Sequence, residues 1–268
     1  FDNVAKDYQE METGSTPVRR YVEAHTALKL AYPLEGKSVL DVACSDGFFS
    51  RLLKRGGARA VTGIDLSPQM IGLALAAEQV EQLGIEYRVG NILGDVEPGQ
   101  YDLVYSSFVL SYAKDPEELV AMCRALYRQL KPGGLFISMN DNPDMLKDSV
   151  EGFRKYGKTK QIKPDLVDGA TITVTWEAHD GAGQIKPFSF DCRYYTGKTL
   201  VCAMEQVGFT DIQIHQAEVS PEGLEEFGAA FWELLSLIHI SAPTRLLSIS
   251  YAVFFLKTPP LTTTLPHN

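Results

Sequence analysis

The sequence predicts an α/β fold in which a doubly wound, mostly parallel sheet is flanked by helices. Between residues 37 and 140, short apolar runs alternate with helical patterns, which is typical of parallel strand–helix units. The links between these units are short, and turn residues or helix caps mark most of their ends. Of the 268 residues, 45% are hydrophobic, so the chain can bury a large core.

The first part of the sheet follows from three apolar runs and two helices. Ser38 to Asp41 and Ala60 to Asp65 have the length and composition of strands. The helix expected between them, Phe48 to about Arg55, has its apolar residues on one face and ends at two glycines. The second helix starts after Ser67, whose side chain can cap it ahead of a proline. Ile85 to Val89 is the third expected strand.

Two further strands, Tyr101 to Ser106 and Leu135 to Met139, complete the parallel part. The helix between them starts at Asp115, which can cap it and is followed by a proline and two acidic residues. That helix ends ahead of Pro132-Gly133-Gly134. Five strands joined by short links favour a doubly wound sheet.

The pattern changes after residue 140, and we expect an insertion on the substrate side over residues 143–195. Its first part, residues 143–170, is polar and is expected to lie above the sheet. Thr171 to Ala178 and Phe188 to Tyr194 alternate between polar and apolar residues, which predicts a β-hairpin over the site.

The remaining segments complete one domain. Thr199 to Val207 is expected to be a helix and Ile212 to Val219 a strand. Residues 1–35 are expected to form a helical cap or lid on a main domain that covers residues 36–234.

Charge and cysteine content exclude several classes of function. The formal net charge is -9 and the pI is about 5.1, so a nucleic-acid partner is not expected. We interpret the one basic stretch, Arg154 to Lys163, as a solvated loop. The four cysteines have no CxxC spacing, which favours a reduced, cytoplasmic protein without a zinc site. The longest apolar run, Leu246 to Leu256, is too short for a membrane span. The sequence leaves the oligomeric state open.

A glycine-containing turn after the first strand, with an acid at the end of the second, is typical of sites for adenosine cofactors. A dinucleotide requires GxGxxG, because its pyrophosphate approaches the backbone closely. Here the loop from Ala43 to Gly47 has one glycine, and the nearby carboxylates of Asp41 and Asp46 would repel a pyrophosphate. These acids suit a ligand with a cationic amine and a sulfonium. An NAD(P)-linked oxidoreductase is therefore a disfavoured alternative.

Five segments resemble, in order, the motifs of the class I methyltransferases that depend on S-adenosylmethionine. They are VLDVACSDGFFSRLL, GIDLSPQMI, YRVGNI, YDLVYSSFVL and LKPGGLFIS. The resemblance implies a Rossmann-like fold, an enzyme that transfers methyl groups, and S-adenosylmethionine as the cofactor.

The resemblance also implies a set of cofactor-binding residues. They are Tyr8, Arg19, Asp41, Ala43, Cys44, Gly47, Asp65, Leu66, Met70, Asn91, Ile92 and Ser106. Asp65 would accept hydrogen bonds from both ribose hydroxyls, and Tyr8 and Arg19 would close over the methionine end. Asn91 stands where the family usually has an acid facing the adenine amino group, and its amide oxygen can accept that bond. Ser45 replaces a family glycine, so its Cβ implies crowding or a strained turn. A non-catalytic protein of the same fold is therefore a second alternative.

Within the family, residues 1–234 resemble a small-molecule subgroup that includes the toxoflavin-pathway N-methyltransferase. The resemblance extends to Met139-Asn140-Asp141-Asn142-Pro143 after the fifth strand. We expect the acceptor to be a heterocycle-like metabolite methylated on nitrogen or oxygen. Asp141 is the expected orienting group or base, beside Asn142, with Tyr112 and Tyr194 as walls for a ring. The acid that metal-dependent relatives carry after the fourth strand is missing, so no metal is expected.

The last segment, residues 235–268, resembles translated sequencing-adaptor read-through rather than a continuation of the domain. We hypothesise that it is an artefact of sequence assembly. The hypothesis predicts that this segment is poorly ordered and that its removal preserves cofactor binding.

Overall fold

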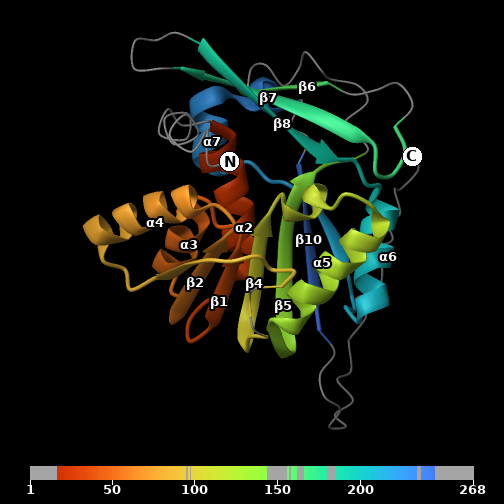
Figure 1. Ribbon diagram of the computed structural model, residues 1–268. Helices are drawn as coiled ribbons and strands as arrows, with labels where there is room; N and C mark the ends of the chain where they lie inside the picture. The colour runs from red at the N-terminus through yellow and green to blue at the C-terminus, as the bar shows by residue number, and fades with distance from the viewer. Residues whose placement is uncertain are drawn as a thin grey trace, which may run out of the picture.

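The computed structural model describes residues 17–94, 96, 98–143, 156, 158–161, 166–179, 185–233 and 237–244. Within these residues the strands form a seven-stranded sheet and a three-stranded sheet, and helices cover both faces of the larger one (Figure 1). The strand order of the larger sheet is β3-β2-β1-β4-β5-β10-β9. The predicted doubly wound α/β fold is therefore confirmed.

Five parallel strands make up most of the larger sheet. They are β1 (Ser38–Val42), β2 (Ala60–Asp65), β3 (Glu86–Val89), β4 (Tyr101–Ser107) and β5 (Leu130–Asp141). Each pairs in parallel with its neighbour, so their carboxyl ends meet at one edge of the sheet. Asp65 and Asp141 stand at that edge, at the ends of β2 and β5.

The helices lie on two sides of this sheet. One side carries α2 (Ala24–Ala31), α3 (Phe48–Arg55) and α4 (Pro68–Glu81), and the other carries α5 (Pro116–Arg128) and α6 (Gly197–Val207). Two expected caps are confirmed, because Ser67 accepts from the backbone N–H of Met70 and Asp115 from that of Glu118. Shorter elements are η2 (Arg19–Glu23), η3 (Val109–Tyr112), α7 (Pro221–Phe227) and η6 (Ala229–Trp232).

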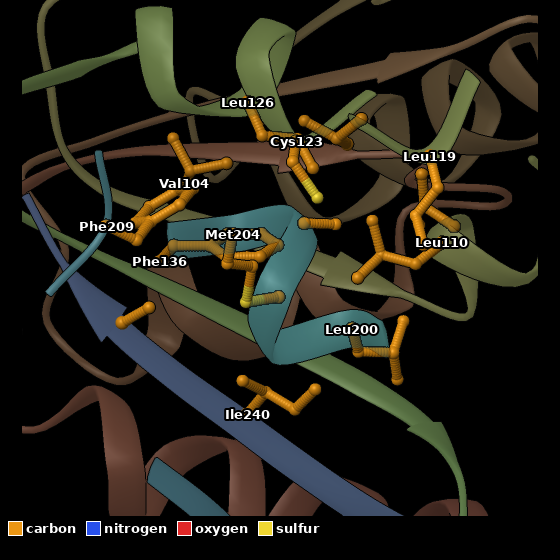
Figure 2. Close-up of a cluster of buried hydrophobic side chains, with 14 of the residues drawn as sticks. Val104, Leu110, Leu119, Cys123, Leu126, Phe136, Leu200, Met204, Phe209 and Ile240 are labelled. Atoms are coloured by element: carbon orange, nitrogen blue, oxygen red, sulfur yellow. The ribbon is translucent and has the colours of Figure 1, made fainter. Parts of the chain in front are cut away.

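The core divides into two layers because successive strand residues point to opposite faces. Leu103 and Tyr105 pack in the layer of α2 and α3, whereas Val104 packs in the layer of α5 and α6. In the second layer Leu200 and Met204 of α6 lie close to side chains of the sheet, including Ile240 (Figure 2). Packing of the two layers holds the sheet in place, and with it the carboxyl edge at which Asp65 and Asp141 lie.

The three-stranded antiparallel sheet lies above the carboxyl edge of the larger sheet (Figure 1). Its strands are β6 (Lys158–Gln161), β7 (Thr171–His179) and β8 (Ile185–Arg193). The expected hairpin is confirmed as β7 and β8, which pair from Thr171 with Arg193 to His179 with Ile185. The interpretation of the basic stretch as a solvated loop is wrong at Lys160, which lies on β6 with its side chain only 1% exposed.

Residues 237–243 form strand β10 (Leu237–Pro243), which lies inside the larger sheet. It pairs antiparallel with β5 on one side and with β9 (Gln213–Gln216) on the other. The expected poor order of the last segment is therefore wrong for residues 237–244, because β10 supplies buried side chains and the backbone partners of β5. Burial lowers the pKa of His239 on this strand to about 4, so its ring is neutral near pH 7. Residues 245–268 lie outside the described residues.

Candidate functional site

A cavity of about 360 Å³ lies between the carboxyl edge of the larger sheet and the three-stranded sheet. From the larger domain it is lined by Val18, Arg19, Glu23, Val42, Ala43, Cys44, Ser45, Phe49, Ile64, Asp65, Leu66, Met70, Gly90, Asn91, Ile92, Ser107, Phe108, Val109, Ser111, Tyr112, Met122 and Asp141. Tyr156, Lys160, Val174, Trp176, Phe190 and Cys192 line it from the insertion. The cavity therefore reaches from the expected cofactor loop to the expected acceptor residues.

Asp65 is held at the end of β2 by the backbone on both sides. One carboxylate oxygen accepts from the N–H of Ser45 at 2.9 Å, and the other accepts from the N–H of Ser67 at 2.9 Å. A carboxylate offers about four acceptor positions, so these two bonds orient it and leave capacity for a ligand. These two bonds fix the carboxylate at the cavity wall.

Asn91, Ile92, Leu66 and Met70 form the wall beside Asp65. The side-chain oxygen of Asn91 accepts from the backbone N–H of Leu93 at 2.9 Å, which fixes the amide at the start of a turn. Met70 and Ile92 are buried, whereas Leu66 is 68% exposed at the surface of the cavity. An apolar wall next to an oriented amide suits a flat ring with polar edges.

Charged residues gather on the side of the N-terminal segment. Arg19 of η2 is buried, and one of its guanidinium nitrogens lies 3.3 Å from a carboxylate oxygen of Asp46. The guanidinium carbon stands 4.2 Å from the centroid of the Phe48 ring, within the range of a cation–π contact. Glu23 of the same turn is also buried and lines the cavity. Arg19 and Glu23 thus offer one cation and one anion to the same part of the cavity.

The carboxylate of Asp46 sits at the N-terminus of α3, which is the place where a dinucleotide would put its pyrophosphate. It accepts from the N–H of Phe48 at 3.3 Å and pairs with Arg19 and Arg51. The carboxylate of Asp46 therefore occupies the backbone N–H group of Phe48 at this helix terminus.

Three of the expected cofactor residues are not among those that line the cavity. Asp41 is buried on β1 and accepts a hydrogen bond from Ser50. Desolvation raises the pKa of its carboxyl to about 7, because it outweighs the lowering effect of that hydrogen bond. Gly47 packs against Tyr87, and Ser106 lies 3.2 Å from Ser138 inside the sheet. Asp41, Gly47 and Ser106 therefore lie outside the lining of the cavity. Tyr8 lies outside the described residues.

The loop between β1 and α3 holds two residues with side chains in the left-handed region. Ala43 has a φ of 57° and Ser45 a φ of 52°, and both line the cavity. A side chain in this conformation costs about 1–2 kcal/mol. The strain expected at Ser45 is therefore present.

We expect Ser45→Gly to leave the chain about as stable or up to about 1 kcal/mol more stable, because relief of strain offsets the greater freedom of glycine when unfolded. The same change removes a Cβ from the cavity wall, so the affinity for an adenosine ligand should rise. Urea denaturation and calorimetric titration measure the two effects. Ser45→Ala, which keeps the Cβ and the strain, is the control, and a gain equal to that of the glycine variant would contradict the explanation.

The acceptor side of the cavity brings Asp141 and Tyr112 together with the insertion. Tyr112 lies at the end of η3, and its ring centroid is 6.3 Å from that of Phe190. Desolvation raises the pKa of its hydroxyl, which excludes Tyr112 as a base at neutral pH. Asn142 is buried beside Asp141 but does not appear in the lining, and Tyr194 packs with Ile172 inside the insertion instead of forming a cavity wall.

Sequence reasoning missed Lys160, Trp176, Phe190 and Glu23, all of which line the cavity. Trp176 shares one face of β7 with Val174, and Phe190 is paired with Val174 across the hairpin. The alternation of the two strands could have identified this face, since residues two apart point the same way. No comparable signal marks Lys160, whose burial depends on its distant partner Asp141.

Residues 40–138 match the model of a protein family described as a methyltransferase domain. The matched range starts on β1 and ends on β5, and it includes the loop after β1 and Asp65. Over this range, which is less than half of the chain, the sequence is similar to methyltransferase domains. None of the described helices combines the length and apolar content that crossing a membrane requires.

Curated relatives of this chain include two bacterial proteins named ubiquinone biosynthesis O-methyltransferase. The protein from Bordetella avium (strain 197N) is 37% identical over 128 residues, which are 46% of this chain and 52% of the relative. The one from Coxiella burnetii (strain Dugway 5J108-111) is 35% identical over 130 residues, 47% of this chain and 51% of the relative. The chain thus spans about half the length of the curated relatives it matches.

Solved structures show the same fold over most of the chain. An S-adenosylmethionine-dependent methyltransferase from Clostridium acetobutylicum ATCC 824 matches with a TM-score of 0.61 and 17% identity, covering 83% of this chain and 90% of that one. CalS10 from Micromonospora echinaspora, an amino pentose methyltransferase solved with S-adenosylmethionine, matches with a TM-score of 0.59 and 19% identity, covering 91% and 97%. These likenesses show the fold of these structures over most of this chain.

Proposed function

We propose that this chain transfers a methyl group from S-adenosylmethionine to a nitrogen or oxygen atom of a small, heterocycle-like acceptor. One observation carries the proposal: Asp65 and Asp141, at the ends of β2 and β5, line one cavity from two sides. The first has the geometry of an acceptor for ribose hydroxyls, and the second faces the insertion. The matched methyltransferase domain and its small-molecule relatives support this function.

The residues at the cavity fit S-adenosylmethionine by their chemistry. Asp65 would hold the ribose hydroxyls, Asn91 the edge of the adenine, and Leu66 its face. The guanidinium of Arg19 suits the carboxylate of the methionine part, and the carboxylate of Glu23 suits its ammonium. An NAD cofactor fits poorly because the carboxylate of Asp46 stands at the N-terminus of α3, where it would face the pyrophosphate.

When bound, the sulfonium supplies an activated methyl group with a good leaving group. The chain has to align the acceptor with that group and exclude water, and no covalent nucleophile is needed. Cys44 lines the cavity, but desolvation raises the pKa of its thiol, so it is not a nucleophile at neutral pH. The insertion lines the cavity with Val174, Trp176 and Phe190, which gives the acceptor side apolar walls beside the ion pair of Lys160 and Asp141.

We expect Asp65→Ala to weaken the binding of S-adenosylhomocysteine at least about 100-fold. Loss of two hydrogen bonds to a charged group, at about 1.5 kcal/mol or more each, gives this factor. Isothermal titration calorimetry on the full chain measures it, with NAD titrated in parallel and expected to show no binding. Glu205→Ala is the matched control, because that carboxylate is exposed on α6 away from the cavity.

The outcomes separate the alternatives. Binding of S-adenosylhomocysteine that does not depend on Asp65 would contradict the proposed orientation of the cofactor. Binding of NAD alone would favour the oxidoreductase. A folded chain that binds neither would favour a non-catalytic protein with the strained Ser45 in its loop.

A further inference from the structure

Arg51 is a cation on α3 that the proposed function does not yet use. Its side chain is 12% exposed, and one of its guanidinium nitrogens donates to the backbone oxygen of Asp46 at 2.6 Å. A second guanidinium nitrogen lies 3.7 Å from the carboxylate of the same residue. Arg51 is not among the described residues that line the cavity. Its effect on a bound cofactor therefore has to pass through Asp46.

The carboxylate of Asp46 stands between two arginines. One of its oxygens lies 3.3 Å from a guanidinium nitrogen of Arg19, which lines the cavity. Its other oxygen lies 3.7 Å from a guanidinium nitrogen of Arg51. The side chain of Asp46 is 13% exposed, so solvent and salt screen these contacts only weakly. One negative charge is thus shared by two positive charges.

The ion pairs continue from Arg51 to the surface of the molecule. A third nitrogen of Arg51 lies 3.7 Å from the carboxylate of Glu81, the last residue of α4. Glu81 also pairs with Arg55, whose side chain is 53% exposed. From Arg19 to Arg55 the charges alternate in sign, with three arginines and two carboxylates. Within this series the arginines exceed the carboxylates by one, and the Arg19 end of the series lies in the cavity.

This balance of charge suits the methionine end of S-adenosylmethionine, which carries one carboxylate and one ammonium. Glu23, which is buried and lines the cavity, offers an anion to the ammonium. Arg19 offers a cation to the carboxylate to the extent that Asp46 does not neutralise it. Because Arg51 draws on the same carboxylate of Asp46, it limits that neutralisation.

Building on the proposed function, we propose that Arg51 is a positioning residue for the carboxylate of S-adenosylmethionine. Arg51 shares the charge of Asp46 and so keeps the positive potential of Arg19 directed at the cavity. Its bond to the backbone oxygen of Asp46 holds the end of the loop after β1. A residue that only stabilised α3 would affect all adenosine ligands equally, whereas this role concerns ligands that carry the carboxylate.

The test compares two ligands by isothermal titration calorimetry on the full chain. One is S-adenosylhomocysteine, and the other is S-adenosyl-3-thiopropylamine, which differs from it only by the missing carboxyl group. The wild-type chain should bind S-adenosylhomocysteine about tenfold more tightly, because a charge-assisted contact to the carboxylate is lost in the amine. Arg51→Met should lower the affinity for S-adenosylhomocysteine about fivefold and change that for the amine less than about twofold.

Three further variants separate charge from packing. In the double variant Arg51→Met with Asp46→Asn, the carboxylate that neutralises Arg19 is also absent, so the preference for S-adenosylhomocysteine should return to within about twofold of the wild type. Arg19 keeps its contact with the ring of Phe48 in that variant. Arg51→Lys keeps the charge and should retain most of the preference. Arg55→Met is the matched control and should leave the preference unchanged, because solvent screens the exposed end of the series.

The outcomes decide the role of Arg51. Equal losses of affinity for both ligands in Arg51→Met would show a purely structural residue and overturn the inference, as would a preference that stays at the wild-type value. A double variant no better than the single one would also overturn it. Where Arg51→Met does not fold, Arg51→Gln takes its place, because it removes the charge and keeps an N–H donor.

The wild-type chain separates this inference from the proposed function. If it binds neither ligand, the proposed function fails and the inference fails with it. If it binds both ligands equally well, the carboxylate is not recognised and the inference alone is overturned.

Discussion

A chain that ends at Leu234 should lose its cooperative fold, although its motifs for the cofactor are all present. Removal of β10 leaves β5 without its partner from Leu135 to Asp141 and separates β9 from the sheet. Leu237, Ile238 and Ile240 are at most 3% exposed, and loss of each such side chain costs about 2–5 kcal/mol. The total is about 6 kcal/mol or more, which is comparable with the stability of a typical domain.

Urea denaturation followed by circular dichroism measures this effect, and a chain ending at Thr244 is the control because it keeps β10. The control should unfold cooperatively and bind S-adenosylhomocysteine. If the chain ending at Leu234 is as stable as the control, β10 is dispensable. That result would support the hypothesis that the last segment derives from adaptor sequence.

Gly47→Ala should destabilise the chain by about 3 kcal/mol, the second large effect that we expect. Gly47 has a φ of 80°, and a Cβ there would lie 2.4 Å from the hydroxyl oxygen of Tyr87. The left-handed conformation accounts for about 1 kcal/mol and the collision with a buried ring for about 2 kcal/mol. The loop that carries Ser45 should move as well, so the affinity for S-adenosylhomocysteine should fall.

Gly36→Ala separates the two contributions. Gly36 has a φ of 77°, close to that of Gly47, but a Cβ added there would have no atom of the described residues within 4 Å beyond its chain neighbours. It should therefore lose only about 1 kcal/mol in urea denaturation. Equal losses for the two alanine variants would show that the contact with Tyr87 contributes nothing.

The sequence by itself determined the parallel sheet and the part of the cavity that we propose holds the cofactor. The starts of α4 and α5 depend on neighbouring residues, since Ser67 and Asp115 cap helices that begin one residue later. Asp65 could be placed in the same way, because it is the last residue of the short, mostly apolar segment that forms β2. For these features, the interactions that matter lie within a few residues along the chain.

The tertiary structure alone decided the acceptor side and the completion of the sheet. Lys160 is buried because β6 brings it to Asp141, and neither residue signals the other in the sequence. Asp41 stands in the cofactor motif, yet the structure buries it behind the cavity against Ser50. Strand β10 lies between β5 and β9 and pairs with both. No local pattern around residue 237 indicates these two partners. Strand pairing and buried ion pairs join distant segments, so they are settled only when the chain packs.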